Sequence, residues 1–346
     1  MNDKLGIGFI GCGEIAVATA KGLAMAQNAR LAMAMDVSEA LAKDMGEQYQ
    51  APFTTDVDKL LASPDVHAVY IATPHHLHAP MAIKAAQAGK HVMVEKPIAT
   101  TVADGREMIA ACRKAGVKLS VFLCMRYAPS IVKAKELVEK GAVGKIFAIR
   151  IQALGDKPAA YWTGGYSGRA KTDWRVSKEK SGGGILIMNA VHNIDAMRFI
   201  TGLEATRVYA EYGTYATPVE VEDMIYVTLR YSNGAVGSIE GCSCVKGGLG
   251  DGQFRADRIY GADGQLVLTS PVKLFTTKTL DGIAPNKWQE VPQGPAVDTR
   301  TRYIEEFVDA VRAGKEPPIT GEDGLAALAI IAAAYESGVT CRAVSL

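Results

Sequence analysis

The chain has 346 residues, 48% of them hydrophobic and 22% charged, which is the composition of a globular protein. This excludes a disordered or fibrous chain, and at about 150 residues per domain the length suggests about two domains. Lys and Arg total 38 against 37 for Asp and Glu. The sequence therefore lacks the basic excess that is typical of nucleic-acid-binding proteins.

The cysteine pattern and the lengths of the apolar stretches indicate in which cellular compartment the protein is expected. Six cysteines are scattered without a CxxC pair, which predicts neither a disulfide framework nor a zinc site. The first residues lack the charged and apolar regions of a signal peptide, and no apolar stretch reaches the ~18 residues of a membrane span. We expect a cytoplasmic protein with no metal, membrane or nucleic-acid partner.

The first third of the chain alternates short apolar runs with helical patterns. Strands are expected at 5–10, 30–36, 66–73, 91–94 and 118–122, and helices at 14–27, 38–49, 77–88 and 102–115. Gly89 and Gly116 follow two of these helices as C-cap glycines. Apolar strands that alternate with helices predict that residues 1–124 form an α/β Rossmann domain with a doubly wound parallel sheet.

Beyond residue 124 the predicted strands follow one another. We expect a helix at 131–140, a strand at 145–154, a long loop to 183, a helix at 185–201, strands at 205–214, 222–232, 235–245, 252–260 and 264–269, and helices at 299–313 and 322–337. The turn at Asn233-Gly234 marks a hairpin. Residues 125–346 are therefore predicted to form an α+β domain with a large open, mostly antiparallel sheet. Its uncovered face predicts a homodimer or homotetramer.

A glycine-rich turn follows the first predicted strand. In Gly11-Cys12-Gly13-Glu14-Ile15-Ala16, Gly11 permits the tight turn, Gly13 lets the backbone approach a pyrophosphate, and Ala16 allows close helix–strand packing. The helix N-terminus that opens at Glu14 and Ile15 offers N–H groups to the phosphates. A tight turn without a ligand is the alternative, but the strand–turn–helix context favours a dinucleotide.

An acidic residue closes the second predicted strand. Asp36 stands 25 residues after Gly11, where its carboxylate can accept hydrogen bonds from the adenosine ribose hydroxyls. A 2′-phosphate would be repelled, and no Arg follows at position 37 or 38. The sequence therefore favours NAD over NADP.

Two further motifs follow the third and fourth long strands. Thr73-Pro74-His75-His76-Leu77-His78 and Glu95-Lys96-Pro97 stand just beyond the strand ends, where open α/β sheets bind ligands. With the glycine turn, they resemble the glucose–fructose oxidoreductase / inositol dehydrogenase (Gfo/Idh/MocA) family of NAD(P)-dependent oxidoreductases. The resemblance covers nearly the whole chain, including Gly182-Gly183-Gly184 before a helix with His192 and Asp195.

The resemblance implies the roles of several residues. Glu95 is expected to hold the cofactor and Lys96 to be catalytic as well as in contact with the cofactor. Thr73, Pro74, His75 and His78 complete the cofactor-binding set. For Lys96 alone, a solvated lysine at a strand end is the alternative.

His192 is the candidate base. A dehydrogenase that oxidises a hydroxyl needs a group that titrates near neutrality, and His192 is the only one of the six histidines outside the first third. A buried structural histidine is the alternative. Many relatives carry Asp or Asn four residues earlier, where this chain has Met188, and Asn189 would lie on another face of a regular helix. Cys124 similarly stands where relatives often have Asn.

Residues 155–183 form a long aromatic and basic loop. It holds two of the three tryptophans, with six basic and three acidic residues. Aromatic faces stack on sugars and Arg forks bind carboxylates, so a substrate loop is expected. A solvated loop at a subunit contact is the alternative. The residues predicted to bind substrate are Arg126, Trp162, Trp174, Arg175 and Asn189.

These features predict an NAD-dependent dehydrogenase that oxidises a secondary hydroxyl of a sugar, polyol or sugar acid by hydride transfer to nicotinamide. A redox-neutral NAD-dependent lyase or glycosidase and a cis-dihydrodiol dehydrogenase of the same family are alternatives. A non-catalytic NAD-binding sensor is an alternative of another class.

Overall fold

The computed structural model describes residues 4–247 and 256–346. Contacts divide the chain into two compact units. The first contains Met1–Cys124, Pro158–Gly182 and Asp298–Leu328, and the second contains Met125–Lys157, Gly183–Val297 and Ala329–Leu346. One break coincides with the predicted boundary at 124. Two segments that the sequence placed in the second domain, 158–182 and 298–328, make their contacts within the first unit.

The first unit contains a six-stranded parallel sheet. Its strands are β1 (Leu5–Ile10), β2 (Ala29–Met35), β3 (Phe53–Thr54), β4 (Ala68–Ile71), β5 (His91–Val94) and β6 (Leu119–Val121). The order is β3-β2-β1-β4-β5-β6, so the strand order reverses between β1 and β4. This confirms the predicted Rossmann sheet, and the reversal is the switch point at which such sheets bind ligands.

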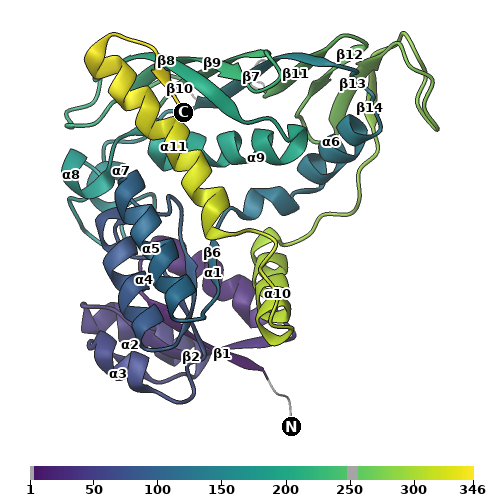
Figure 1. Cartoon of the computed structure of the whole chain (residues 1–346). Coiled ribbons are helices and arrows are strands. Elements are labelled where there is room, and N and C mark those ends of the chain that lie inside the picture. Colours follow the sequence, from purple (N-terminus) through teal and green to yellow (C-terminus); the bar gives the residue numbers. More distant parts are fainter. Residues whose placement is uncertain (1–3, 248–255) are drawn as a thin grey trace. The chain divides into compact units, whose positions relative to one another are not determined.

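Helices with recognisable caps flank this sheet. They are α1 (Glu14–Met25), α2 (Glu39–Tyr49), α3 (Val57–Ala62), α4 (His78–Gln87), α5 (Val102–Lys114) and α10 (Thr299–Arg312), with shorter turns at η1 (His75–Leu77), α7 (Tyr161–Gly164) and α8 (Lys178–Ser181). The Thr101 hydroxyl caps α5 by accepting from the Asp104 N–H. Gly89 and Gly116 adopt φ values of +73° and +68° after α4 and α5, as expected for C-cap glycines. Figure 1 shows α4 and α5 side by side.

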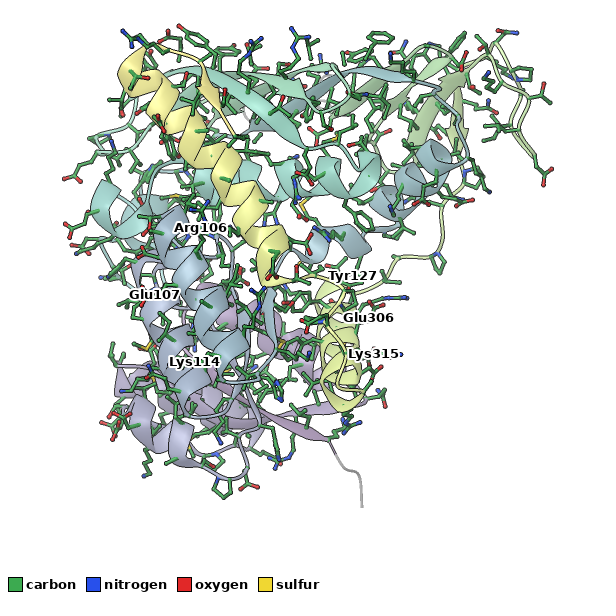
Figure 2. All side chains as sticks on the ribbon, viewed as in Figure 1. Arg106, Glu107, Lys114, Tyr127, Glu306 and Lys315 are labelled. Carbon is green, nitrogen blue, oxygen red and sulfur yellow. The ribbon has the colours of Figure 1, made fainter. Side chains whose placement is uncertain are left out.

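Helix α10 packs closely on α1, although almost 300 residues separate them in the sequence. A Cβ atom at Gly22 would lie 2.9 Å from Cβ of Arg300, so only glycine permits this approach. The Thr301 hydroxyl donates to the Gly22 carbonyl at 3.0 Å. This packing brings Arg300 to the Rossmann sheet, whereas Glu306 lies further along α10 (Figure 2).

The second unit contains a nine-stranded mixed sheet. Its strands are β7 (Ile146–Leu154), β8 (Ala205–Gly213), β9 (Met224–Tyr231), β10 (Val236–Cys242), β11 (Arg258–Gly261), β12 (Gly264–Val267), β13 (Val272–Thr276), β14 (Gln289–Val291) and β15 (Val344–Ser345). The order is β14-β13-β12-β11-β7-β10-β9-β8-β15, and of these neighbouring pairs β7 and β10 are parallel. The predicted open, mostly antiparallel sheet is confirmed. The predicted strand at 252–260 lies partly outside the described residues.

Helices cover one face of this sheet. They are α6 (Pro129–Glu139), α9 (Val191–Thr201) and the C-terminal part of α11 (Gly321–Thr340), and Figure 1 shows α6 and α9 beneath the strands. Along β9, Ile225, Val227 and Leu229 are buried and the residues between them are exposed. The opposite face carries the exposed side chains of Tyr209, Tyr226 and Val236. Among the described residues, none of the helices combines the length and hydropathy needed to cross a bilayer.

Candidate active site

The glycine turn of the first unit leaves space for a phosphate group. Gly11 has φ +94°, and a Cβ there would lie 2.8 Å from the Ala72 carbonyl oxygen, so a larger residue is excluded. A Cβ at Gly13 would meet nothing within 4 Å. Gly13 is the N-cap of α1 and offers no side-chain cap, so its side chain satisfies none of the first N–H groups of α1. The residues present therefore fit a dinucleotide pyrophosphate.

Asp36 is fixed beside this turn. Its Oδ2 accepts from the Cys12 N–H and its Oδ1 from the Ser38 N–H, both at 2.8 Å. Val37 follows with 87% of its surface exposed, and it provides no positive charge for a 2′-phosphate. Two backbone N–H groups therefore hold this carboxylate beside the glycine turn, just after the end of β2.

The ends of β4 and β5 bring the predicted cofactor residues together, because these strands are neighbours. The Thr73 hydroxyl is buried and has no hydrogen-bond partner among the described residues, which marks it as a donor left for a ligand. His78 is completely buried, with Nδ1 at 2.7 Å from the Pro97 carbonyl oxygen and Nε2 at 3.1 Å from that of Thr73. His78 thus braces the two loops against each other, and its direct contact with cofactor stays a prediction.

Glu95 and Lys96 stand at the centre of these loops. The Glu95 carboxylate is buried and accepts from the Tyr70 hydroxyl at 2.6 Å. Lys96 is half-buried, and its peptide bond to Pro97 is cis. Burial lowers the pKa of the Lys96 ammonium, and the negative charge of Glu95 opposes this effect. A lysine with a lowered pKa at a ligand-binding edge can exchange a proton with substrate.

The predicted substrate loop adds aromatic side chains to the same strand ends. The ring of Trp174 lies 4.4 Å from that of His75. The Arg175 guanidinium lies 4.5 Å from the Trp174 ring and 5.1 Å from that of Tyr161. Trp162 is buried, with only 3% exposed. Trp174 and Arg175 therefore lie with the cofactor residues of the first unit, while the contact of Trp162 with substrate stays a prediction.

The loop also attaches to the glycine turn. Both carboxylate oxygens of Glu14 accept loop N–H groups, from Tyr166 at 3.0 Å and Ser167 at 2.7 Å. Arg169 donates to the Cys12 carbonyl at 2.9 Å and pairs with Asp44 at 2.7 Å. Ile15, the neighbour of Glu14, is half-buried. The sequence assigned Glu14 to the cofactor, and the structure joins it to a segment more than 150 residues away.

In the second unit, a buried carboxylate holds the start of the helix that carries His192. Glu222 accepts from the Gly184 N–H at 2.6 Å, the Leu186 N–H at 3.0 Å and the Tyr335 hydroxyl at 2.9 Å. A Cβ at Gly184 would lie 1.9 Å from the Glu222 carbonyl oxygen, so this glycine is needed for packing. Burial raises the pKa of Glu222. Its position at the first N–H groups of the helix satisfies donors that have no partner within the helix.

The helix itself begins with a π-helical turn, η3 (Leu186–Ala190), which leads directly into α9. Between residues 185 and 197 the half-buried positions are Asn189, His192 and Asn193, whereas Met188 is buried. The wider π-turn replaces the regular α-helix assumed for this segment, and π-turns are frequent at functional sites. Asn189, and not residue 188, therefore shares the uncovered side of the helix with His192.

Two buried carboxylates fix this helix and one predicted substrate residue. Asp257 accepts from the Asn193 side chain at 2.7 Å and from the Gln152 N–H at 2.9 Å, and burial raises its pKa to about 6. Asp195 accepts from Arg126 Nε at 2.8 Å and Nη2 at 2.6 Å. In the structure the Arg126 guanidinium is thus a member of a buried ion pair, and its contact with substrate stays a prediction.

The sequence did not point to Arg300, Tyr70, Glu222 or Asp257. Each is a single polar residue without a motif around it, and each acts through a partner far away in the chain. One signal was present for Arg300, since Asp298 and Thr299 before it mark a helix start.

Comparisons with known proteins agree with this architecture. Residues 5–123 match the oxidoreductase family with an NAD-binding Rossmann fold, and residues 131–267 match the GFO/IDH/MocA C-terminal domain. A levoglucosan dehydrogenase of Pseudarthrobacter phenanthrenivorans is 32% identical over 62% of this chain and 58% of its own length. A myo-inositol 2-dehydrogenase of Thermotoga maritima is 30% identical over 98% of both chains. The WlbA dehydrogenase of Bordetella pertussis in complex with NADH and UDP-GlcNAcA is 28% identical, with a TM-score of 0.83 over 99% of both chains.

Proposed function

Because the chain belongs to the Gfo/Idh/MocA family of NAD(P)-dependent oxidoreductases, we propose that it is an NAD-dependent dehydrogenase acting on a secondary hydroxyl of a sugar, polyol or sugar acid. The observation that carries the proposal is Lys96, a half-buried lysine with a lowered pKa at the ligand-binding edge of the Rossmann sheet. The dehydrogenases among the relatives support the substrate class.

Each residue has a distinct task in this proposal. When bound, NAD supplies the acceptor for the hydride that leaves the carbinol carbon. His192 accepts the proton of the substrate hydroxyl, and Lys96 stabilises the negative charge that develops on the oxygen. Asn189 shares the uncovered side of the helix with His192, so its amide is suited to orient either the imidazole or a substrate hydroxyl. The faces of Trp174 and the guanidinium of Arg175 are suited to a sugar ring and a carboxylate.

A substrate panel tests the proposal. Purified protein is incubated with NAD or NADP and with sugars, polyols, sugar acids and cis-dihydrodiols, and NADH formation is followed by absorbance. We expect a signal with NAD and a sugar or polyol, and none from His192→Ala. A signal with dihydrodiols alone would assign the protein to that alternative. Silence across the panel with NAD bound would contradict the proposal and favour either a redox-neutral enzyme or a sensor.

One observation favours a second candidate, a redox-neutral lyase or glycosidase that retains its NAD. The contacts of Glu14 and Arg169 attach the loop at 158–182 to the glycine turn. A loop attached there would slow the dissociation of a dinucleotide bound at this turn. Co-purification of stoichiometric NAD, with substrate consumed and no net NADH, would favour this candidate. Loss of NAD on simple gel filtration would contradict it.

The choice of cofactor depends on the charge of Asp36. Asp36→Asn removes the negative charge and keeps one oxygen to accept the N–H of Cys12 or Ser38. We expect the preference for NAD over NADP to fall roughly tenfold, equivalent to about 1.4 kcal/mol. Titration of both cofactors by protein fluorescence measures this ratio. Glu39→Gln, an exposed change nearby, is the control and should leave it unaltered.

We also propose that the uncovered face of the nine-stranded sheet binds a second copy of the chain. Tyr226 on β9 is 55% exposed, and Tyr209 and Val236 lie on the neighbouring strands β8 and β10. Light scattering coupled to gel filtration should give at least a dimer, and Tyr226→Lys should shift the population towards monomer. A monomer of the unaltered protein would contradict this prediction.

A further inference from the structure

We propose that Arg300 is a positioning residue that fixes the Glu95 carboxylate behind Lys96 and balances its charge. The inference rests on the proposed function of Lys96, and it assigns a role in the candidate site to a helix near the C-terminal end of the chain. No motif in the sequence indicates this role.

The geometry is a buried polar chain within the first unit. Arg300 Nη1 donates to the Thr19 hydroxyl at 2.8 Å and lies 3.5 Å from Glu95 Oε1. The hydroxyls of Thr19 and Tyr70 are 2.9 Å apart, and Tyr70 donates to the same oxygen of Glu95. The central carbon of the guanidinium also lies 5.3 Å from the centroid of the Phe122 ring. Arg300 is therefore held by hydroxyl, carboxylate and ring contacts at once.

The second oxygen of Glu95 faces Lys96. Glu95 Oε2 accepts from the Lys96 N–H at 3.3 Å, so the carboxylate that Arg300 holds is also joined to the backbone of the candidate catalytic lysine. The side chain of Glu95 is 7% exposed and that of Arg300 is 24% exposed. Solvent therefore screens their charges weakly, and a change at Arg300 reaches Lys96 through Glu95.

At least six titratable groups of the first unit act on Lys96, and three of these six are neutral. Burial raises the pKa of the Cys124 thiol and lowers the pKa of the His75 and His78 imidazoles, so these three carry no charge near neutral pH. The charged groups are Glu95, Arg300 and Arg175. The carboxylate favours the ammonium form of Lys96, and the two guanidinium groups disfavour it.

Removal of the Arg300 charge should therefore raise the pKa of Lys96. The Glu95 carboxylate would then act on the ammonium without a nearby guanidinium to offset it. We expect a rise of roughly one pH unit in Arg300→Gln, since a nearby like charge disfavours the ammonium form and its removal restores that form. Arg300→Lys keeps the positive charge and should stay near the unaltered protein.

Competitive acetylation of the full-length protein measures this directly. The rate at which the Lys96 amine reacts with acetic anhydride is followed against pH by mass spectrometry of the peptide that contains it. Arg106→Gln is the matched control, because Arg106 is an exposed arginine on α5 of the same unit (Figure 2). Glu95→Gln is the complementary variant and should lower the pKa of Lys96.

The outcomes separate this inference from the proposed function. A rise in Arg300→Gln, absent from Arg106→Gln and reversed in Arg300→Lys, supports the role of Arg300. An unchanged Lys96 pKa in a folded Arg300→Gln overturns it. If that variant does not fold, a Lys96 pKa that does not fall in Glu95→Gln overturns it instead. A rise in the pKa of Lys96 without any change in the pH profile of kcat leaves the inference standing and contradicts a catalytic role for Lys96.

Discussion

Lys96→Ala should lower kcat by roughly 10²–10⁴-fold, the range for a positioned acid–base group, while the Kd for NADH changes little. The expected loss falls on kcat because the ammonium acts on charge that develops at the substrate oxygen only as the reaction proceeds. The glycine turn and Asp36 that are proposed to hold the dinucleotide are not altered by this substitution. Steady-state kinetics on the substrate found in the panel, with NADH binding followed by fluorescence, measures both quantities.

Lys114→Ala is the control for this prediction. Lys114 is an exposed lysine at the end of α5, in the same unit as Lys96 (Figure 2). Its replacement removes one positive charge without touching the strand ends, so kcat should not change. Equal kcat values for the unaltered protein and Lys96→Ala would remove Lys96 from the chemistry and leave His192 as the candidate acid–base group.

The sequence predicts the sheets better than it predicts their edges. Hydrophobic periodicity and turn residues identified β1, β2, β4, β5 and β6, because each is a buried apolar run between turn signals. The sequence analysis missed β3 and β15, which have two residues each, and also β13 and β14 towards one edge of the large sheet. Such short strands exist because a neighbouring strand supplies hydrogen-bond partners, and this information is not contained in their own residues.

The candidate site also contains some residues that the sequence indicates and some contacts that it does not. Gly11, Gly13 and Asp36 could be found because local backbone geometry and strand ends dictate these residue types. The attachment of Glu14 to Tyr166 and Ser167 could not be found, since it joins segments about 150 residues apart by contacts to backbone N–H groups that any residue offers. A contact to a backbone N–H group cannot be predicted from residue type, because every residue except proline has this group.

The π-turn before His192 shows a third kind of limit. The sequence predicts a regular helix over 185–201, and the structure begins this helix with a π-turn instead. The buried Glu222 accepts from the N–H groups of Gly184 and Leu186, where the π-turn begins, and within this turn Asn189 is half-buried while Met188 is buried. The residue types were visible in the sequence, but the carboxylate that holds the start of the helix lies almost 40 residues further along the chain.

Asp195→Ala should destabilise the protein by about 3–5 kcal/mol, the range for a buried ion pair that loses one member. Arg126 is 8% exposed and donates two hydrogen bonds to this carboxylate, so its guanidinium would lose a bidentate partner in a buried place. The midpoint of urea unfolding measures the effect. Because two apolar residues of similar volume remove both charges together, Arg126→Met combined with Asp195→Leu should recover most of the loss.

The same variants, measured for both stability and KM, decide between two roles for Arg126. If Arg126 is mainly a member of the buried pair, Arg126→Met lowers stability strongly, and the paired replacement keeps KM close to that of the unaltered protein. If Arg126 binds the substrate, KM rises in both variants whatever their stability. Glu290→Ala is the control, because Glu290 is 60% exposed in its pair with Lys273, which is itself 38% exposed, and such surface pairs contribute about 0–1 kcal/mol. A loss in Asp195→Ala no larger than in this control would contradict the assignment of Arg126 to the core of the second unit.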